Sequence, residues 1–319
     1  MPLENRPLIL ATILVIATTG TAPVRAQVVC GGTVGPGGTV ALTADVGPCG
    51  NLTNPAVRVI GPVTFDLAGF RILCDPNAPP NGIRAEGKSA KITRGSVESC
   101  QSGIQLRGDG KHKIEDLVSR RNNEGFEIDS NKNKLKRVAA IENAENGFLV
   151  TGNGNKIEDA EAVGSTDGHG FEVVGDGNTF KRIAISKSDE EGLLVEGDDN
   201  RIKDCRLTDN RGPGADLEGE NNKIEKCLVS SNGDGDGSDS GIEIDGTDTQ
   251  VKKNVVLDND PRGIHVHGGA ANNVIKQNTV LGNEANDVQD DTACGTNTWQ
   301  KNKFGTSEAD GVADSPCIQ

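Results

Sequence analysis

A short unit, in which glycine is followed by an apolar, a variable and a second apolar residue, recurs along most of this chain. The alternation has the period of two that is expected of a strand burying one face. A turn rich in glycine and asparagine follows each unit, and then a second alternating segment. The units start, 21 to 27 residues apart, at Gly82, Gly103, Gly125, Gly147, Gly170, Gly192, Gly214, Gly241 and Gly263, with a further unit at Ala285.

This repeat of about 22 residues predicts an all-β fold, a single-stranded right-handed parallel β-helix solenoid of about ten coils. No window carries a convincing helical stripe. Each coil would bury its apolar side on its neighbours, so a solenoid can fold with only 34% hydrophobic residues. Equivalent residues of successive coils should form rows with a spacing of about 4.8 Å.

One such row begins with apolar residues and should therefore point inward. It ends in Asn254, Asn278 and Asn302, and we expect these to form a buried ladder because buried amides need hydrogen-bond partners. Cys205 and Cys227 stack in the same row, and a pair of buried thiols is favoured here over a disulfide between coils. A second asparagine row falls at the turn before the second strand: Asn133, Asn155, Asn178, Asn200, Asn222, Asn273 and Asn297.

The N-terminus is typical of a secretory signal. An apolar run from Leu8 to Ala17 precedes small residues that end before Gln27, and the run is too short to span a bilayer. We therefore expect a secreted protein, extracellular or periplasmic, with no membrane span in its mature part. The predicted segments are a signal peptide (1–26), an N-terminal cap (27–56), the β-helix (57–304) and a closing tail (305–319).

All eight cysteines follow the predicted signal, and an even number in an oxidising compartment predicts disulfides. Cys30 and Cys49 bracket the expected cap, and Cys294 and Cys317 flank the tail. Cys74 and Cys100 make a plausible third pair. The connectivity stays open at this point, because sequence spacing does not prove a pairing.

Three segments, "GPVTFDLAGFRIL", "AKITRGSVESCQSGIQLRGDG" and "NNVIKQNTVLGN", resemble the parallel β-helix repeats of pectate-lyase-like and NosD-like secreted proteins. The tail from Cys294 onward resembles the C-terminal closure of bacterial members. The resemblance covers residues 57–319 and implies the fold. Members include lyases, epimerases, hydrolases and non-catalytic proteins, so the resemblance does not choose an activity.

A five-residue insertion lengthens the unit after Gly214, within "SNGDGDGSDSGIE". It matches the twelve-residue calcium loop, except that asparagine replaces the first aspartate. Ca²⁺ prefers hard oxygen ligands, and Gly237 stands where the loop needs a sharp turn. The alternative is a polar turn extension without an ion. The predicted ligands are Asn232, Asp234, Asp236, Ser238 and Glu243.

Beside this insertion, the variable position of each unit should face solvent. Coils 214–267 bring carboxylates and histidines onto that face, which suits acid–base chemistry or a divalent cation. Arg262 or His265 is the candidate base, with Glu243 as the third catalytic residue, while the alternative is a solvated acidic face. The row should continue past His265 to Asp287. The predicted substrate-binding residues are Asp216, Glu218, Asp245 and His267.

These features favour a protein that binds or acts on polysaccharide, by Ca²⁺-assisted lyase or epimerase-like chemistry. In uronate elimination a cation neutralises the carboxylate and a base removes the adjacent C5 proton. The alternatives are a non-catalytic surface or periplasmic scaffold and, by resemblance, NosD-like copper handling. Copper has few soft ligands here, because the chain has no methionine after Met1.

The formal net charge of −14 argues against a nucleic-acid partner. One basic row nevertheless runs along the coils. Glutamates on the same strands, such as Glu115, Glu158 and Glu225, would neutralise it locally, and the alternative is a groove for an anionic polysaccharide. The members of the row are Lys91, Lys113, Lys134, Lys156, Arg201 and Lys223.

Overall fold

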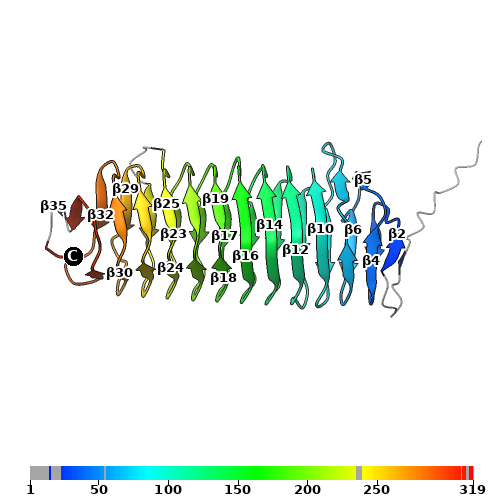
Figure 1. Ribbon diagram of the computed structural model, residues 1–319, viewed down its shortest axis with the longest axis horizontal. Coiled ribbons are helices and arrows are strands. Elements are labelled where there is room, and N and C mark those ends of the chain that lie inside the picture. The colour runs from blue at the N-terminus through cyan, green and yellow to red at the C-terminus, as the bar shows by residue number, and fades with distance from the viewer. Residues whose placement is uncertain are drawn as a thin grey trace, which may run out of the picture.

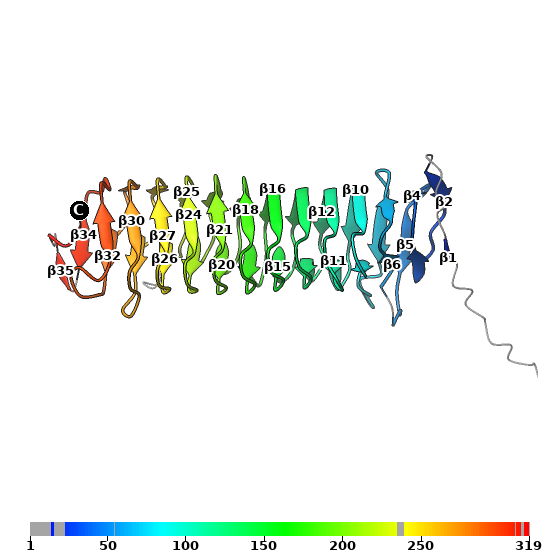
Figure 2. The same cartoon turned by 90° about the horizontal axis from the view of Figure 1, so that it is seen from below.

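The computed structural model describes residues 14–15, 23–53, 55–234, 239–309, 311–313 and 316–318. Most of the expected signal peptide lies outside these residues, as do Asp236 and Ser238 of the predicted calcium loop. The described residues form strands and turns without a helix, and so include no helix able to cross a membrane. Figures 1 and 2 show an elongated rod whose coils follow one another in chain order.

The first sheet receives one strand from each coil, and its strands are parallel except for the last pair. Its members are β1 (Leu14–Val15), β3 (Gly32–Val34), β6 (Val57–Ile60), β9 (Ile83–Glu86), β11 (Ser102–Leu106), β13 (Glu124–Ile128), β15 (Phe148–Val150), β17 (Phe171–Val173), β20 (Leu193–Val195), β23 (Ala215–Leu217), β26 (Ser240–Ile244), β29 (Arg262–Val266), β32 (Asn286–Asp290), β34 (Ser307–Ala309) and β35 (Val312–Ala313).

The second sheet receives the rest of each coil, either as one bent strand or as two short ones. Its members are β2 (Val24–Ala26), β4 (Thr39–Leu42), β5 (Val46–Cys49), β7 (Thr64–Asp66), β8 (Arg71–Cys74), β10 (Lys91–Glu98), β12 (Lys113–Arg120), β14 (Lys134–Ile141), β16 (Lys156–Val163), β18 (Thr179–Lys181), β19 (Ala184–Ser186), β21 (Arg201–Lys203), β22 (Arg206–Thr208), β24 (Lys223–Glu225), β25 (Leu228–Ser230), β27 (Gln250–Lys252), β28 (Val255–Leu257), β30 (Val274–Lys276), β31 (Thr279–Leu281) and β33 (Thr298–Gln300).

The predicted parallel β-solenoid is therefore confirmed, with about 12 coils of about 22 residues where about ten were expected. Glycine opens most units because the coils stack closely there. A Cβ atom added to Gly241 would lie 2.7 Å from the carbonyl oxygen of Gly263 in the next coil. A larger residue would push the two strands out of register.

The last predicted unit was expected to start at Ala285, and the strand register shows that this was wrong. Asp287, not Ala285, stands opposite Gly263. The strand pairs place Gln289 beside His265, where Asp287 was expected. The chain between β29 and β32 is two residues longer than a usual coil. The sequence pattern missed this shift because no glycine marks the start of the unit.

A bend at a single residue divides the second sheet's segment of each coil. Asp116, Arg137, Asp159 and Arg182 occupy successive bends, all with a left-handed backbone (φ between 52° and 57°). Arginine Nε lies 2.5 Å from an aspartate Oδ1 in the pairs Arg137–Asp116 and Arg182–Asp159. The alternating charges of the row thus pair between coils.

The interior is a stack of like side chains. Phe126, Phe148 and Phe171 are fully buried, with ring centroids 4.6 and 4.2 Å apart. Such stacking lets each coil bury its apolar residues on its neighbours without a wide core.

The predicted asparagine ladder is confirmed. The backbone N–H of Asn254 donates to Oδ1 of Asn278 at 2.9 Å, and that of Asn278 donates to Oδ1 of Asn302 at 3.0 Å. The side-chain amides of Asn254 and Asn278 donate to the same acceptors. Each amide thus satisfies a backbone donor of the preceding coil, which the turn alone would leave unpaired. The second asparagine row forms the same kind of ladder.

All three predicted disulfides are present: Cys30–Cys49, Cys74–Cys100 and Cys294–Cys317. The preference for buried thiols at Cys205 and Cys227 was wrong, because these residues form a fourth disulfide. Their Cα atoms lie 4.4 Å apart, since they stack directly on neighbouring coils.

Candidate functional site

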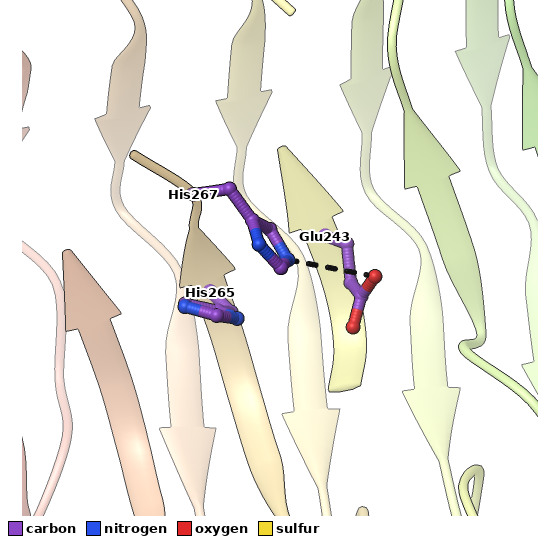
Figure 3. Close-up of side chains that lie close together, drawn as sticks. All are labelled: Glu243, His265 and His267. Atoms are coloured by element: carbon purple, nitrogen blue, oxygen red, sulfur yellow. Dashed lines mark ion pairs between the residues drawn. The ribbon is translucent and has the colours of Figure 1, made fainter. Parts of the chain in front are cut away.

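Three neighbouring strands of the first sheet carry the site. Their register places Asp216 of β23 beside Glu243 of β26, and Glu243 beside His265 of β29. His267 follows at the end of β29, and Figure 3 shows its ring directed toward Glu243. We call the following residues the carboxylate–histidine cluster: Asp216, Glu243, Asp245, His265, His267 and Asp291.

The middle row of this cluster is buried, which corrects the expectation that it faces solvent. Asp216, Glu243 and His265 expose only 8%, 7% and 4% of their surface. Strands about 4.8 Å apart force neighbouring side chains to cover one another. Sequence alternation reports which side of a strand a residue is on, but not how deeply its neighbours shield it.

His265 is held in one orientation. Its Nε2 lies 2.8 Å from Oδ2 of Asp291, while its buried Nδ1 has no hydrogen-bond partner. A proton on Nε2, donated to Asp291, leaves a lone pair on Nδ1. Burial lowers the pKa of His265 below its usual value, although the hydrogen bond to Asp291 opposes this shift. The ring is therefore neutral at neutral pH and can accept a proton or bind a metal ion.

His267 stands between two carboxylates. Its Nε2 lies 3.6 Å from Oε2 of Glu243 and 3.9 Å from Oδ2 of Asp245. Glu243 raises the pKa of His267, and Asp245 adds to the effect against the cost of burial. The two histidine rings lie with their centroids 3.9 Å apart. The cluster thus contains one imidazole biased toward the neutral form and one biased toward the charged form.

Asp216 is the most perturbed carboxyl of the cluster. Burial, with the negative charges of Glu243 and Asp245, raises the pKa of Asp216 to about 8. Oδ1 of Asp216 and Oε1 of Glu243 are buried without a hydrogen-bond partner. Burial also raises the pKa of Asp245 and of the neighbouring Glu218. Asp216 therefore carries a proton at neutral pH unless a cation binds beside it.

The cluster offers two overlapping sets of metal ligands, and Glu243 belongs to both. In one set Glu243, His265 and His267, and in the other Asp216, Glu243 and Asp245, each present one ligand atom within 4.8 Å of the others. The all-carboxylate set suits a hard cation such as Ca²⁺. The set with two imidazoles suits zinc or copper better.

Arg262, the other candidate base, lies at the start of β29. Its Nε donates to Oε1 of Gln289 at 2.7 Å, and Nε2 of Gln289 donates to Oδ1 of Asp291 at 2.8 Å. Arg262 is thus joined through Gln289 to the carboxylate that holds His265. Sequence reasoning missed Asp291 and misplaced Gln289, because both follow the long turn that shifts the register of β32.

Asn232 and Asp234, the described members of the predicted calcium loop before β26, form hydrogen bonds with neighbouring residues. Oδ1 of Asn232, which is buried, accepts hydrogen bonds from the backbone N–H and side-chain amide of Asn210, at 3.2 and 2.8 Å. The ligand role expected of Asn232 stays a prediction, and its Oδ1 already takes part in these two hydrogen bonds. Asp234 Oδ2 accepts a hydrogen bond from Arg211 Nε at 2.9 Å. The missed signal is a third asparagine row: Asn210, Asn232, Asn259 and Asn283.

Comparisons with known proteins agree with this architecture. Residues 146–304 match the family model described as the right handed beta helix region. A comparison with curated protein sequences gives no significant match.

Three solved structures illustrate the likeness. The A-module of the Azotobacter vinelandii mannuronan C-5 epimerase AlgE4 is 15% identical, with a TM-score of 0.55 over 86% of this chain and 87% of that one. The periplasmic alginate epimerase AlgG is 13% identical, with a TM-score of 0.61 over 89% and 77%. The Dettilon tailspike protein is 12% identical, with a TM-score of 0.51 over 92% and 61%. At these identities the likeness concerns the fold alone.

Proposed function

We propose that this chain, a right-handed parallel β-helix repeat protein, acts on a uronate-containing polysaccharide by moving a proton at the carboxylate–histidine cluster. The observation that carries the proposal is the buried, unpartnered Nδ1 of His265 beside carboxyl oxygens that also lack partners. Buried polar groups without partners are costly, and their concentration at one place on a regular solenoid favours a functional site.

His265 is the proposed base. Its Nδ1 carries the free lone pair, and Asp291 stabilises the positive charge that arises when the ring accepts a proton. The lowered pKa of His265 keeps the ring neutral before the reaction. Arg262 is assigned a positioning role, since its guanidinium is joined to His265 through Gln289 and Asp291.

Asp216 is a proposed cation ligand. It lies two strands from His265, on the other side of Glu243, and thus about 10 Å away. With a pKa of about 8 it holds a proton at neutral pH until a cation displaces that proton. A base beside a cation that binds the carboxylate of the sugar suits either C5 epimerisation or β-elimination, because both begin with loss of the C5 proton.

Ca²⁺ fits the carboxylate set of Asp216, Glu243 and Asp245 better than the described part of the 232–243 loop. Two oxygens in that set are buried without partners, whereas Asn232 and Asp234 are already bonded to other residues. A cation held there would neutralise the carboxylate of the sugar and increase its C5 acidity. Asp236 and Ser238 remain predicted ligands outside the described residues.

Two further observations support the proposal. The names of two structural neighbours state that they are mannuronan and alginate epimerases. Four disulfides suit an oxidising compartment, in keeping with a secreted or periplasmic location.

The proposal predicts cation-dependent turnover of a polyuronate. Alginate and polygalacturonate would be incubated with the protein in Ca²⁺ or in chelator, and products followed by the absorbance of the unsaturated uronate and by NMR of the epimer ratio. His265→Gln should lower the rate by about a hundredfold or more. Asp167→Asn, a control at an exposed turn in another coil, should leave the rate unchanged. At low Ca²⁺ concentration the rate should rise as the pH approaches 8, because Ca²⁺ competes with the proton on Asp216, and Asp216→Asn should lose this rise.

Other outcomes would favour the alternatives. Binding without product in any condition would favour a non-catalytic scaffold and overturn the proposed chemistry. A rise in melting temperature with Cu²⁺ or Zn²⁺ but not with Ca²⁺, lost in His267→Gln, would assign the cluster to transition-metal handling through Glu243, His265 and His267.

A further inference from the structure

A long basic strip lies on the second sheet. It consists of the two outward positions of nine successive strands: β10, β12, β14, β16, β18, β21, β24, β27 and β30. The strand register places eleven cationic side chains and three carboxylates at these positions. This excess of positive charge is found in a chain whose formal net charge is −14.

The positive charges are stacked directly on one another. Lys91, Lys113, Lys134 and Lys156 are register partners on four consecutive coils, about 4.8 Å apart. Only Lys91 of these has a carboxylate within 4.0 Å among the described residues, Glu115 at 2.9 Å. Like charges stacked across strands destabilise a sheet, so the column costs free energy unless an anion lies against it.

Crowding also affects the other end of the strip. Burial, followed by the charges of Lys223 and Lys276, lowers the pKa of Lys252. The three glutamates of the strip therefore do not neutralise its positive charge fully. The simpler hypothesis from the sequence, local neutralisation by these glutamates, does not account for the remaining charge.

Three grooves lie along the strip. The largest, about 770 Å³, is lined by Lys91, Lys111, Lys113, Lys132 and Lys134 together with Gly37, Gly38 and Pro62, and its lining contains no carboxylate. Grooves of about 350 and 390 Å³ follow, near Lys156 and near Lys223. The strip thus offers a hollowed, positively charged path along the rod.

The strip and the carboxylate–histidine cluster belong to different sheets of the solenoid. Their charges have opposite sign, so one polyanion would be attracted by the strip and repelled by the cluster in the absence of a cation. The strip is therefore a separate surface and not an extension of the proposed active site.

We infer that the strip is a binding surface for a linear anionic polysaccharide lying along the solenoid axis. One or two cations on each coil, about 4.8 Å from those of the next coil, match a polymer with one carboxylate or sulfate per sugar. Single-stranded nucleic acid would call for exposed aromatic side chains, whereas the middle positions of the strip, such as Phe180 and Ile202, are buried. A membrane surface would call for apolar anchors beside the lysines, and the exposed Val29, Val174 and Val255 lie outside the strip.

Affinity electrophoresis and calorimetry with polygalacturonate and with a sulfated glycan test this inference, with neutral dextran as the uncharged probe. The triple variant Lys113→Gln, Lys134→Gln, Lys156→Gln should weaken binding about tenfold or more, and binding should fall as salt rises. The matched control Lys187→Gln, Arg206→Gln, Lys303→Gln removes the same number of positive charges from exposed sites away from the strip and should bind as the wild type does. A triple Lys→Arg variant at positions 113, 134 and 156 should retain binding.

Equal affinity of the two glutamine variants would overturn the inference, as would binding that is independent of salt. Tighter binding of an oligothymidylate or of anionic lipid vesicles than of either glycan would overturn the choice of partner. The outcome is distinguishable from that of the proposed function, because strip variants keep the cluster intact and cluster variants keep the strip intact.

Discussion

Asp216 shows how a regular strand produces an unusual acid. The side chain occupies an ordinary outward position of β23, yet Glu243 of the next coil covers it and repels its negative form. Because its pKa is about 8 in the folded protein and near 3.9 in an unfolded chain, the folded state holds a proton that the unfolded state has released between these values. Stability therefore falls as pH rises from about 4 to about 8.

Asp216→Asn should remove part of that fall. The difference in melting temperature between pH 5 and pH 8 should be smaller in the variant than in the wild type, since an amide does not titrate. Burial also raises the pKa of Glu124 to about 8, so the variant should keep a residual decline. Ca²⁺ should stabilise the wild type more at pH 8 than at pH 5, because the cation competes with the proton.

The exposed Asp167 provides the control, and Asp167→Asn should reproduce the wild-type pH dependence. An unchanged pH dependence in Asp216→Asn, with the residue still buried, would contradict the assignment of a raised pKa.

The members of the cluster were predictable from sequence, because the repeat fixes which residues share a row. Their burial was not, since it depends on how long side chains of adjacent coils cover one another. Asp291 was missed because it lies beyond the shifted turn. Asn232 fitted two patterns, a calcium loop and an asparagine ladder, and only the second has partners at the same position in neighbouring coils.

Among the elements, the ladders join one coil to the next. The side chain of Asn278 accepts from the backbone of Asn254 at 2.9 Å and donates to the carbonyl oxygen of Val251 at 2.9 Å. It therefore satisfies backbone groups of the preceding coil that are buried from solvent. Loss of such a side chain leaves a buried donor and a buried acceptor unpaired.

Asn278→Ala should lower the free energy of unfolding by about 2–3 kcal/mol. The exposed Asn131 accepts one backbone hydrogen bond, from Asn153 at 2.7 Å, and Asn131→Ala should cost less than about 1 kcal/mol because water can replace it. Urea unfolding of both variants measures the difference. Similar losses in the two would show that the ladder contributes no more than an exposed turn.

Sequence could predict the coil register as long as glycine opened the unit. It failed at β32, where Asp287 takes the glycine position after a longer turn. The sequence also placed Cys205 and Cys227 in one row, but it did not predict the disulfide between them. A stacked pair of thiols and a disulfide need the same spacing in the chain. The oxidation state depends on the distance and orientation of the two side chains.

For the whole molecule, stacking turns small local preferences into extended surfaces. The same rule of register collects carboxylates and histidines at β23–β29 and cations along the second sheet. Figures 1 and 2 show how the strands of successive coils lie side by side along the rod. The rod therefore has one face suited to holding an anionic polymer and another suited to proton transfer on a sugar.

The most direct test of the account is hydrogen exchange at the sugar itself. Alginate or polygalacturonate would be incubated in D₂O with Ca²⁺ and the protein, and deuterium at C5 measured by NMR. We expect incorporation with the wild type, or loss of the C5 proton into an unsaturated product, and neither with His265→Gln. Absence of any C5 exchange across these polymers with the wild type, or the same exchange in His265→Gln, would contradict proton transfer at the carboxylate–histidine cluster.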